Sequence, residues 1–293
     1  MIPNLALTPD QVKQAVTAVK KRQPALAGMV DFYGRIFVAQ EESKQRHRIE
    51  PPKIKKDIRS NRVREKLPLI EIKEFGYDKK EAGRLFILIC RLAKENNPRL
   101  AGSAKILLEA LAGGLEAGTL FAGLLNGDEA LFENVAGDLG VEKPVLGFIV
   151  YNSLKPSLSI CADQLSANLN SKEPWLRGCC PVCGSPPILS SLEGEGSRYL
   201  FCSFCWQRWA VKRIFCPFCE TSDQSYLHYL FGEEDRDVRV DLCDKCNKYL
   251  KTIDIRSADR LIYPPLEQIA TLHLDFKAQE EGFDSGVQLY MNG

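Results

Sequence analysis

Cys180-Pro-Val-Cys183, Cys202-Ser-Phe-Cys205, Cys216-Pro-Phe-Cys219 and Cys243-Asp-Lys-Cys246 are four Cys-x-x-Cys pairs in the second half of the chain. The two residues inside each pair form a tight turn that aims both sulfurs at one point, and two such turns supply four sulfurs to one ion. The four pairs therefore predict two tetrathiolate metal sites. The alternative, that the cysteines are small buried hydrophobic residues, is plausible for one pair but not for four in succession.

Each turn favours a residue that tolerates positive φ directly after its second cysteine. Gly184 and Asn247 suit this position, Glu220 is neutral, and Trp206 argues against it. The local sequence therefore supports a metal-binding turn best at the first and the last pair.

The four pairs can combine sequentially, interleaved or nested, and the sequence between them favours the sequential arrangement. One plausible hairpin, 188–192 returning as 198–201, lies between the first two pairs, and another, 226–231 returning as 238–242, lies between the last two. Each hairpin would lie under its own metal, as in zinc ribbons and rubredoxins. The linker 206–215 alternates apolar and polar residues and is expected to be a strand that joins two stacked ribbons.

The N-terminal half is predicted to be helical. Thr8 with Gln11 makes a capping-box pattern, and Asp78 with Glu81 caps a later helix in which Cys90 is expected to be a buried core thiol. Further helices are expected to begin near Ser103, near Asp128 and after Pro144, the last one carrying Cys161 and bending at Pro156. The basic segment 46–66 around Pro51-Pro52 is expected to be a solvated loop.

The chain ends with a predicted helix that begins at Pro264-Pro265 and stops near Gly282. Its expected inward-facing residues are Leu266, Ile269, Ala270, His273 and Phe276. The fold class is thus α+β, with an all-helical N-terminal domain, two rubredoxin-like or zinc-ribbon-like metal-binding β modules and a C-terminal helix. We expect domain limits at 1–173, 174–213, 214–256 and 257–293.

Composition narrows the function classes. The 293 residues include 39 basic and 38 acidic side chains, a formal net charge of +1, which disfavours nucleic acid as a partner. No basic run feeds an apolar stretch near Met1, and the apolar segment 107–125 is interrupted by Glu109 and Glu116, so we expect a soluble protein without membrane insertion. Eleven cysteines arranged largely as pairs indicate thiolates in a reducing cytoplasm.

Catalytic patterns are missing from the sequence. It has no phosphate-binding loop, no Gly-x-Ser-x-Gly and no His-Glu-x-x-His, and its three histidines are His47, His228 and His273. A dithiol redox centre normally occurs singly at a helix start, whereas four pairs lie here in hairpin-rich sequence. The sequence therefore predicts a protein that is not an enzyme.

Several motifs together resemble the formate dehydrogenase accessory (FdhE) proteins. They are Cys180-Pro-Val-Cys183-Gly-Ser-Pro, Arg198-Tyr-Leu-x-Cys202-x-x-Cys205 with Trp209, Leu227-His-Tyr229, and Cys243-x-x-Cys246-x-x-Tyr249-Leu-Lys251. The resemblance is close over residues 179–254 and softer elsewhere. This chain has Arg208 and Ala210 where the family often has an acidic residue and a histidine around the tryptophan.

The resemblance implies a cytoplasmic assembly factor that binds the catalytic subunit of a respiratory formate dehydrogenase before export. Two other functions stay open: a nucleic-acid-binding ribbon protein, suggested by Arg198, Tyr199, Arg208, Trp209, Lys212 and Arg213, and a rubredoxin-like electron carrier. Four cysteines accept either zinc or iron, and the resemblance favours iron.

Two metal ions per chain are therefore expected, held by Cys180, Cys183, Cys202, Cys205, Cys216, Cys219, Cys243 and Cys246. Cys90, Cys161 and Cys179 lie outside both sites, although Cys179 adjoins Cys180 and could replace it. The ribbons are the expected recognition surface, with Trp206 as an aromatic anchor and Arg208, Lys212 and Arg213 facing a polar or acidic partner.

Overall fold

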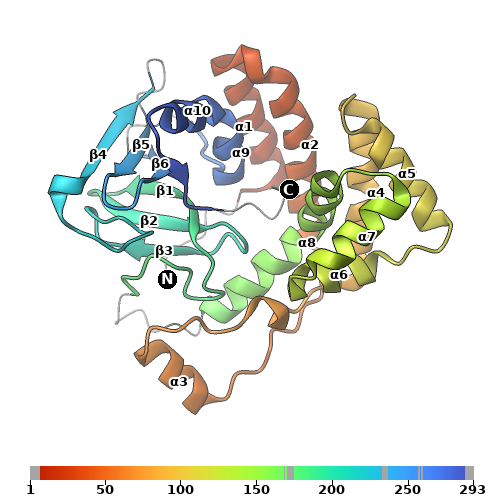
Figure 1. Ribbon diagram of the computed structural model, residues 1–293, viewed down its shortest axis with the longest axis horizontal. Helices are drawn as coiled ribbons and strands as arrows, with labels where there is room; N and C mark the ends of the chain where they lie inside the picture. Colours follow the sequence, from red (N-terminus) through yellow and green to blue (C-terminus); the bar gives the residue numbers. More distant parts are fainter. Residues whose placement is uncertain are drawn as a thin grey trace. The chain divides into compact units, whose positions relative to one another are not determined.

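The computed structural model describes residues 7–167, 169, 175–232, 237–256, 258 and 260–287 (Figure 1). It divides into two compact units. The helical unit comprises Leu7–Pro52 and Glu71–Cys161, and the sheet unit comprises Lys53–Ile70 and Ala162–Val287. The segment Lys53–Ile70 was expected within the helical domain 1–173 but belongs to the sheet unit.

The helical unit is built from α-helices, several of which start after a side-chain cap. They are α1 (Pro9–Arg22), α2 (Ala27–Lys44), α4 (Lys79–Asn96), α5 (Ala101–Ala112), α6 (Ala117–Asn126), α7 (Glu129–Leu139) and α8 (Lys143–Ser166), whose last residues belong to the sheet unit, with short 3-10 turns at Pro24–Leu26 and Ile72–Glu74. Thr8 and Gln11 form the expected capping box, and the Asp78 carboxylate accepts hydrogen bonds from the N–H groups of Lys80 and Glu81. These caps satisfy backbone donors that a helix start leaves unpaired.

Helix α8 is the one described helix long and apolar enough to cross a membrane, and α5 with α6, bent by 114°, passes the same test as a broken pair. The apolar window of α8 is 83% buried inside the structure. Burial of this kind is typical of the core helix of a globular protein. Pro156 lies inside α8, as expected.

The sheet unit contains one sheet with the strand order β3-β2-β1-β6-β5-β4, and β7 pairs with β6 beside this path. Its strands are β1 (Pro187–Glu193), β2 (Ser197–Cys202), β3 (Arg208–Val211), β4 (Leu227–Phe231), β5 (Val238–Cys243), β6 (Lys248–Asp254) and β7 (Asp284–Ser285). Both expected hairpins are present, as β1 with β2 and β4 with β5.

The two ribbons share this sheet and are not stacked, so that expectation is wrong. Strand β1 of the first ribbon pairs in parallel with β6 of the second, with Ser190 opposite Thr252. The linker contains a strand, β3, as expected, but β3 pairs antiparallel with β2 at the outer edge of the first ribbon and does not lie between the two ribbons. A side-by-side arrangement satisfies the backbone groups along β1 and β6, which stacking would leave as open edges.

The C-terminal helix is broken into α9 (Pro264–Ala270) and α10 (Leu272–Glu280). The break at Thr271 shifts the helical phase, so Leu274 and Ala278 are buried while His273 is exposed and Phe276 is 64% exposed. The expectation that His273 and Phe276 face inward is therefore wrong, whereas Leu266 and Ala270 are buried as expected.

The basic segment is not a loop throughout, because Lys56–Arg64 forms helix α3. Just after α3, the N–H groups of Leu69 and Ile70 donate to the carbonyls of Pro181 and Val182, at 3.0 Å each. Leu69 and Ile70 are almost fully buried. The segment is thus fixed to the first Cys-x-x-Cys turn, an anchor that the polar composition did not reveal.

Candidate metal centres

The eight paired cysteines form two groups, and the grouping is sequential. Cys180, Cys183, Cys202 and Cys205 form the first centre, and Cys216, Cys219, Cys243 and Cys246 form the second. Within each group all sulfur atoms lie within 4.8 Å of one another. Each group therefore unites the two Cys-x-x-Cys turns that flank one hairpin.

All four turns place the residue after the second cysteine in the left-handed region. The φ angles are 79° at Gly184, 61° at Trp206, 58° at Glu220 and 53° at Asn247. Trp206 was expected to argue against this geometry, and that expectation is wrong. A left-handed conformation costs a non-glycine residue about 1–2 kcal/mol, which the surrounding turn must offset.

The same backbone bond closes each of the first three turns. The N–H of Cys180 donates to the Ser185 carbonyl at 2.9 Å, and the N–H groups of Cys202 and Cys216 donate in the same way five residues ahead. Because this bond folds the chain back immediately after each pair, both sulfurs project from one side of the turn. The bond that closes each of these turns is thus local to the turn.

The sulfur positions fit a tetrahedral ion. Metal–sulfur bonds of about 2.3 Å require sulfur–sulfur separations of about 3.8 Å. In the first centre the Cys183–Cys202 separation is 3.5 Å and the Cys180–Cys205 separation is 3.7 Å, and in the second centre Cys216–Cys246 is 3.7 Å. These distances far exceed a disulfide bond of about 2.05 Å. The donors are all sulfur in both groups, so each could hold one metal ion in a closed shell.

The two centres differ in exposure. All four cysteines of the first centre are buried, whereas Cys219 and Cys246 of the second are only half-buried. Burial raises the pKa of Cys180, while hydrogen bonds from its three partner cysteines hold the pKa of Cys183 well below the usual value. A metal cation would compensate the negative charge that four clustered thiolates create in such a site.

The remaining cysteines lie outside both groups. Cys90 is fully buried in the helical unit, and burial raises the pKa of its thiol to about 12. Cys161 is also fully buried, and burial raises its thiol pKa. Cys179 is half-buried, and its carbonyl accepts a hydrogen bond from the Trp175 indole at 2.7 Å. The first group of sulfur atoms includes that of Cys180 and not that of Cys179.

A buried ion pair connects the surroundings of the two centres. Arg198 on β2 is 3% exposed, and its guanidinium lies 2.7 Å from the Asp241 carboxylate on β5. It also donates to the Phe215 carbonyl, one residue before Cys216, at 2.7 Å. From sequence alone, Arg198 was assigned only to the family resemblance and to nucleic-acid binding, because its partners Asp241 and Phe215 lie far along the chain.

Of the expected partner-binding residues, Lys212 and Arg213 are exposed and Trp206 is half-buried against the core. The expectation that Arg208 faces solvent is wrong: its side chain contacts the Glu193 carboxylate at 2.8 Å and stacks 4.3 Å from the Tyr199 ring centroid. It is only 6% exposed. The alternating pattern of the strand predicted that the Arg208 side chain faces solvent. The Glu193 carboxylate on β1 instead pairs with the guanidinium and allows it to be buried.

Three of the six residues that suggested nucleic-acid binding are buried. Arg198 and Arg208 are buried in ion pairs, and the buried Trp209 donates its indole N–H to the Arg177 carbonyl at 2.9 Å. Base stacking and phosphate contact both need exposed groups. The arrangement therefore disfavours the nucleic-acid interpretation.

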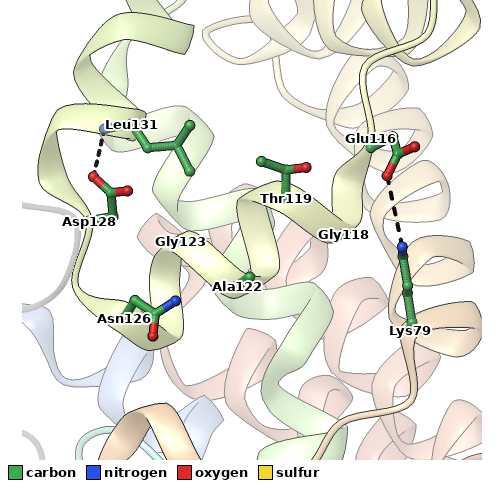
Figure 2. A pocket seen from close by; sticks show the side chains of 9 residues that line it. All are labelled: Lys79, Glu116, Gly118, Thr119, Ala122, Gly123, Asn126, Asp128 and Leu131. Carbon is green, nitrogen blue, oxygen red and sulfur yellow. Dashed lines mark hydrogen bonds and ion pairs between the residues drawn. The ribbon is translucent and has the colours of Figure 1, made fainter.

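A shallow cavity of about 440 Å³ lies in the helical unit (Figure 2). Its lining residues are Lys79, Glu116, Gly118, Thr119, Ala122, Gly123, Asn126, Asp128 and Leu131. Figure 2 shows Lys79 directed at Glu116, at 3.8 Å, and Asp128 accepting the backbone N–H of Leu131. Asp128 caps α7 in this way, so its carboxylate has a structural role.

Comparison with known proteins matches the sheet unit to one family. The central domain of FdhE matches residues 179–213, and the C-terminal domain of FdhE matches residues 214–291. These two ranges contain all eight cysteines of the two centres.

Curated relatives agree with this match. The chain is 37% identical to the FdhE homolog of Aquifex aeolicus over 148 residues, 49% of this chain and 51% of that relative. It is 36% identical to FdhE of Escherichia coli K12 over 111 residues, 36% of this chain and 35% of that protein. The matches thus span about half of the first relative and about a third of the second.

The fold agrees over almost the whole chain. The crystal structure of the FdhE protein from Pseudomonas aeruginosa superimposes with a TM-score of 0.65 and covers 97% of both chains at 19% identity. This likeness shows a shared fold, including the helical half that the family domains do not cover. Residues 179–291, which hold both tetracysteine centres, match the central and C-terminal domains of the FdhE family.

Proposed function

We propose that this protein is a cytoplasmic assembly factor that binds the catalytic subunit of a respiratory formate dehydrogenase during maturation and performs no turnover. The observation that carries the proposal is the pair of closed tetracysteine groups inside FdhE domains. A centre in which sulfur fills all four positions leaves none for a substrate and acts as a rigid scaffold. The family resemblance supplies the dehydrogenase as the partner.

We propose iron as the metal, held by the eight cysteines in two four-sulfur shells. Iron in such a shell can gain or lose one electron, whereas zinc cannot. The eight cysteines would hold the ions, and neighbouring backbone groups would stabilise the sulfur charge. Phe204 and Cys205 donate their backbone N–H groups to the Cys202 sulfur, at 3.4 Å each. Hydrogen bonds to sulfur stabilise thiolate charge with either metal.

The sheet unit is the proposed recognition surface. Lys212 and Arg213 remain candidates because both are exposed, and Ile214 beside them is 45% exposed. Trp206 keeps a smaller role, since its half-buried ring packs against the core. Arg208 is not part of this surface.

The test is co-purification of the tagged protein with the formate dehydrogenase catalytic subunit. The subunit should co-purify with the intact chain. The amount of co-purified subunit should fall in the variant that carries Lys212→Glu plus Arg213→Glu. The matched control is Lys105→Glu plus Arg99→Glu in the helical unit, which should leave binding unchanged. Retention of the subunit by a variant lacking residues 179–254 would place recognition in the helical half and overturn the assignment.

A second candidate is a rubredoxin-like electron carrier, and the partial exposure of Cys219 and Cys246 favours it at the second centre. Electron transfer needs close approach of a donor to the metal, and half-buried sulfur permits this. Elemental analysis with an optical spectrum of protein purified without air tests whether the protein can be an electron carrier as well as an assembly factor. Zinc in both centres would exclude electron transfer while leaving the assembly role intact.

A further inference from the structure

Strand β4 is the outermost strand on one side of the sheet in the part of the chain that the structure describes. Tyr229 is 52% and Phe231 49% exposed, and Tyr226, just before the strand, is 43% exposed. Proteins usually protect an edge strand with lysine, proline or a bulge. Leu227–Phe231 contains neither residue and pairs with β5 without a break in register. This edge therefore remains suited to pairing with another strand.

The register of β4 on β5 shows which backbone groups face outward. The Tyr226 carbonyl accepts a hydrogen bond from the N–H of Asp244, its direct partner, at 3.0 Å. Hydrogen-bonded pairs alternate with non-bonded pairs along an antiparallel ladder. His228 and Leu230 therefore direct their backbone groups to β5, and Tyr229 between them directs its N–H and C=O away from the sheet.

The outward groups extend to both sides of Tyr229. Phe231 follows the same alternation, so its N–H also points away, while its carbonyl accepts from the Lys277 ammonium at 3.4 Å. On the other side, the Leu227 N–H already donates to the Gln224 carbonyl, which leaves the Leu227 carbonyl facing out. An added strand could thus bond to a continuous row of groups from Leu227 to Phe231.

The side chains along this edge are held in place. Leu230 packs into the apolar cluster formed with α10, so Tyr229 and Phe231 lie on the opposite face of the strand. Their rings meet edge to face with centroids 5.3 Å apart, and the Arg239 guanidinium lies 4.7 Å from the Tyr229 centroid. Aromatic groups fixed in this way lose little entropy on binding.

We infer that the β4 edge is the docking strand for an extended segment of the formate dehydrogenase catalytic subunit, an inference that rests on the proposed function. The segment would add a strand beside β4 through backbone hydrogen bonds, with alternate apolar side chains on Tyr229 and Phe231. Main-chain bonds give affinity and side-chain contacts give specificity in this mode of recognition. An incompletely folded client exposes the unpaired backbone that such pairing requires.

A second copy of this chain fits the edge less well. Stable dimers bury about 1,200 Å² or more, and pairing two five-residue strands buries much less. A small interface is instead adequate for an assembly factor, because the client must later be released. The structure therefore favours a transiently bound segment over a permanent dimer.

The test compares Tyr229→Pro with Tyr229→Thr in the full-length, metal-loaded protein. Both variants lose the ring, but only proline removes the outward N–H, a change that an edge strand tolerates. Binding of the purified catalytic subunit should be about tenfold weaker for proline than for threonine, the effect of one lost hydrogen bond and a steric block. Metal content and the circular dichroism spectrum serve as folding controls.

Residue-resolved hydrogen exchange provides the second measurement. In the free protein the amides of Tyr229 and Phe231 should exchange rapidly while those of His228 and Leu230 are protected, and the subunit should protect the first two. If the intact chain binds the subunit but the two variants bind alike and these amides stay unprotected, this inference is wrong while the proposed function stands. Failure of the intact chain to bind overturns both. Protection that grows with the concentration of this chain alone would make a second copy the occupant.

Discussion

The Arg198 guanidinium lies 2.7 Å from the Asp241 carboxylate and joins two ribbons that are distant in sequence. Arg198 comes from β2 and Asp241 from β5, and Asp241 also accepts the Thr252 hydroxyl at 2.6 Å. The pair lies on the face of the sheet opposite α10. Its burial makes each member dependent on the other.

Asp241→Asn should destabilise the sheet unit by about 3–5 kcal/mol, because the buried guanidinium loses its countercharge. Burial already lowers the pKa of Arg198, and Asp241 opposes that effect. Arg198→Met with Asp241→Leu should cost less than the sum of the single changes. Urea unfolding of the native chain, Asp241→Asn, Arg198→Met, Asp241→Leu and the double variant provides the measurement, and strictly additive costs of the two changes in the double variant would contradict a coupled pair. The exposed pair Arg64–Glu65 is the control, where Arg64→Ala should change stability by less than about 0.5 kcal/mol.

Gly178→Ala should weaken the second centre although Gly178 holds no metal. A Cβ at this position would lie 1.7 Å from the Pro217 carbonyl oxygen, a backbone atom inside the third Cys-x-x-Cys turn. Because the turn cannot yield without moving Cys216 and Cys219, we expect a loss of about 2 kcal/mol or more. Thermal unfolding and metal content measure the effect. Gly102→Ala in α5 is the control, since a Cβ there meets nothing within 4 Å; equal effects of the two substitutions would refute this reasoning.

A chelator should remove the metal of the second centre before that of the first. Cys219 and Cys246 are half-buried, whereas Cys180 and Cys202 are fully buried. A chelator can therefore reach the sulfur atoms of the second centre directly, but it can reach those of the first only after the surrounding protein has opened. Native mass spectrometry over time should show a species with one metal, and alkylation should label the second group first. Cys219→Ser should leave one metal, while Cys179→Ser and Cys90→Ser should leave two. Simultaneous loss of both metals would contradict the difference between the centres.

Metal removal should expose the sheet unit to protease while the helical unit keeps its helical signal. Ribbon strands bury too little apolar area to order themselves, and structural zinc supplies about 10 kcal/mol or more in finger peptides. Because Leu69 and Ile70 are bonded to the first turn, trypsin should also cleave within Lys53–Ile70 after chelation. A helical circular dichroism signal that falls in step with metal loss would show that the units depend on each other.

The stability of the helical unit should depend on pH because of the buried Lys155. Burial lowers the pKa of its ammonium from 10.5 to about 7, so between these values the unfolded chain binds a proton that the folded chain lacks. Stability should therefore rise with pH across this window. Lys155→Met should be more stable than the native chain at pH 7, on the order of a few kcal/mol, with the advantage shrinking towards pH 10. Denaturant unfolding followed by helical signal measures this, and an advantage independent of pH would contradict it.

The metal centres could be predicted from sequence because their determinants are local. Each Cys-x-x-Cys turn is closed by bonds within six residues, and each centre unites the two turns that flank one hairpin. The helix starts at Thr8 and Asp78 were predictable for the same reason.

What sequence did not reveal depends on distant partners. The parallel pairing of Ser190 with Thr252 has no local signal, so the ribbons were expected to stack. Arg208 was expected in solvent because the carboxylate that buries it lies on another strand. Trp206 adopts positive φ because the turn determines its backbone conformation more strongly than its side chain does.

The parallel pairing of β1 with β6 also sets an order of events as the chain is made. Strand β1 can pair with β2 soon after both leave the ribosome, but its other edge stays open until the whole second ribbon has been synthesised. Pairings between distant segments form slowly, because a long loop must close before any bond compensates. The first ribbon therefore has one unprotected strand edge until the second ribbon is made, so any delay in completing the second ribbon should favour aggregation of the new chain.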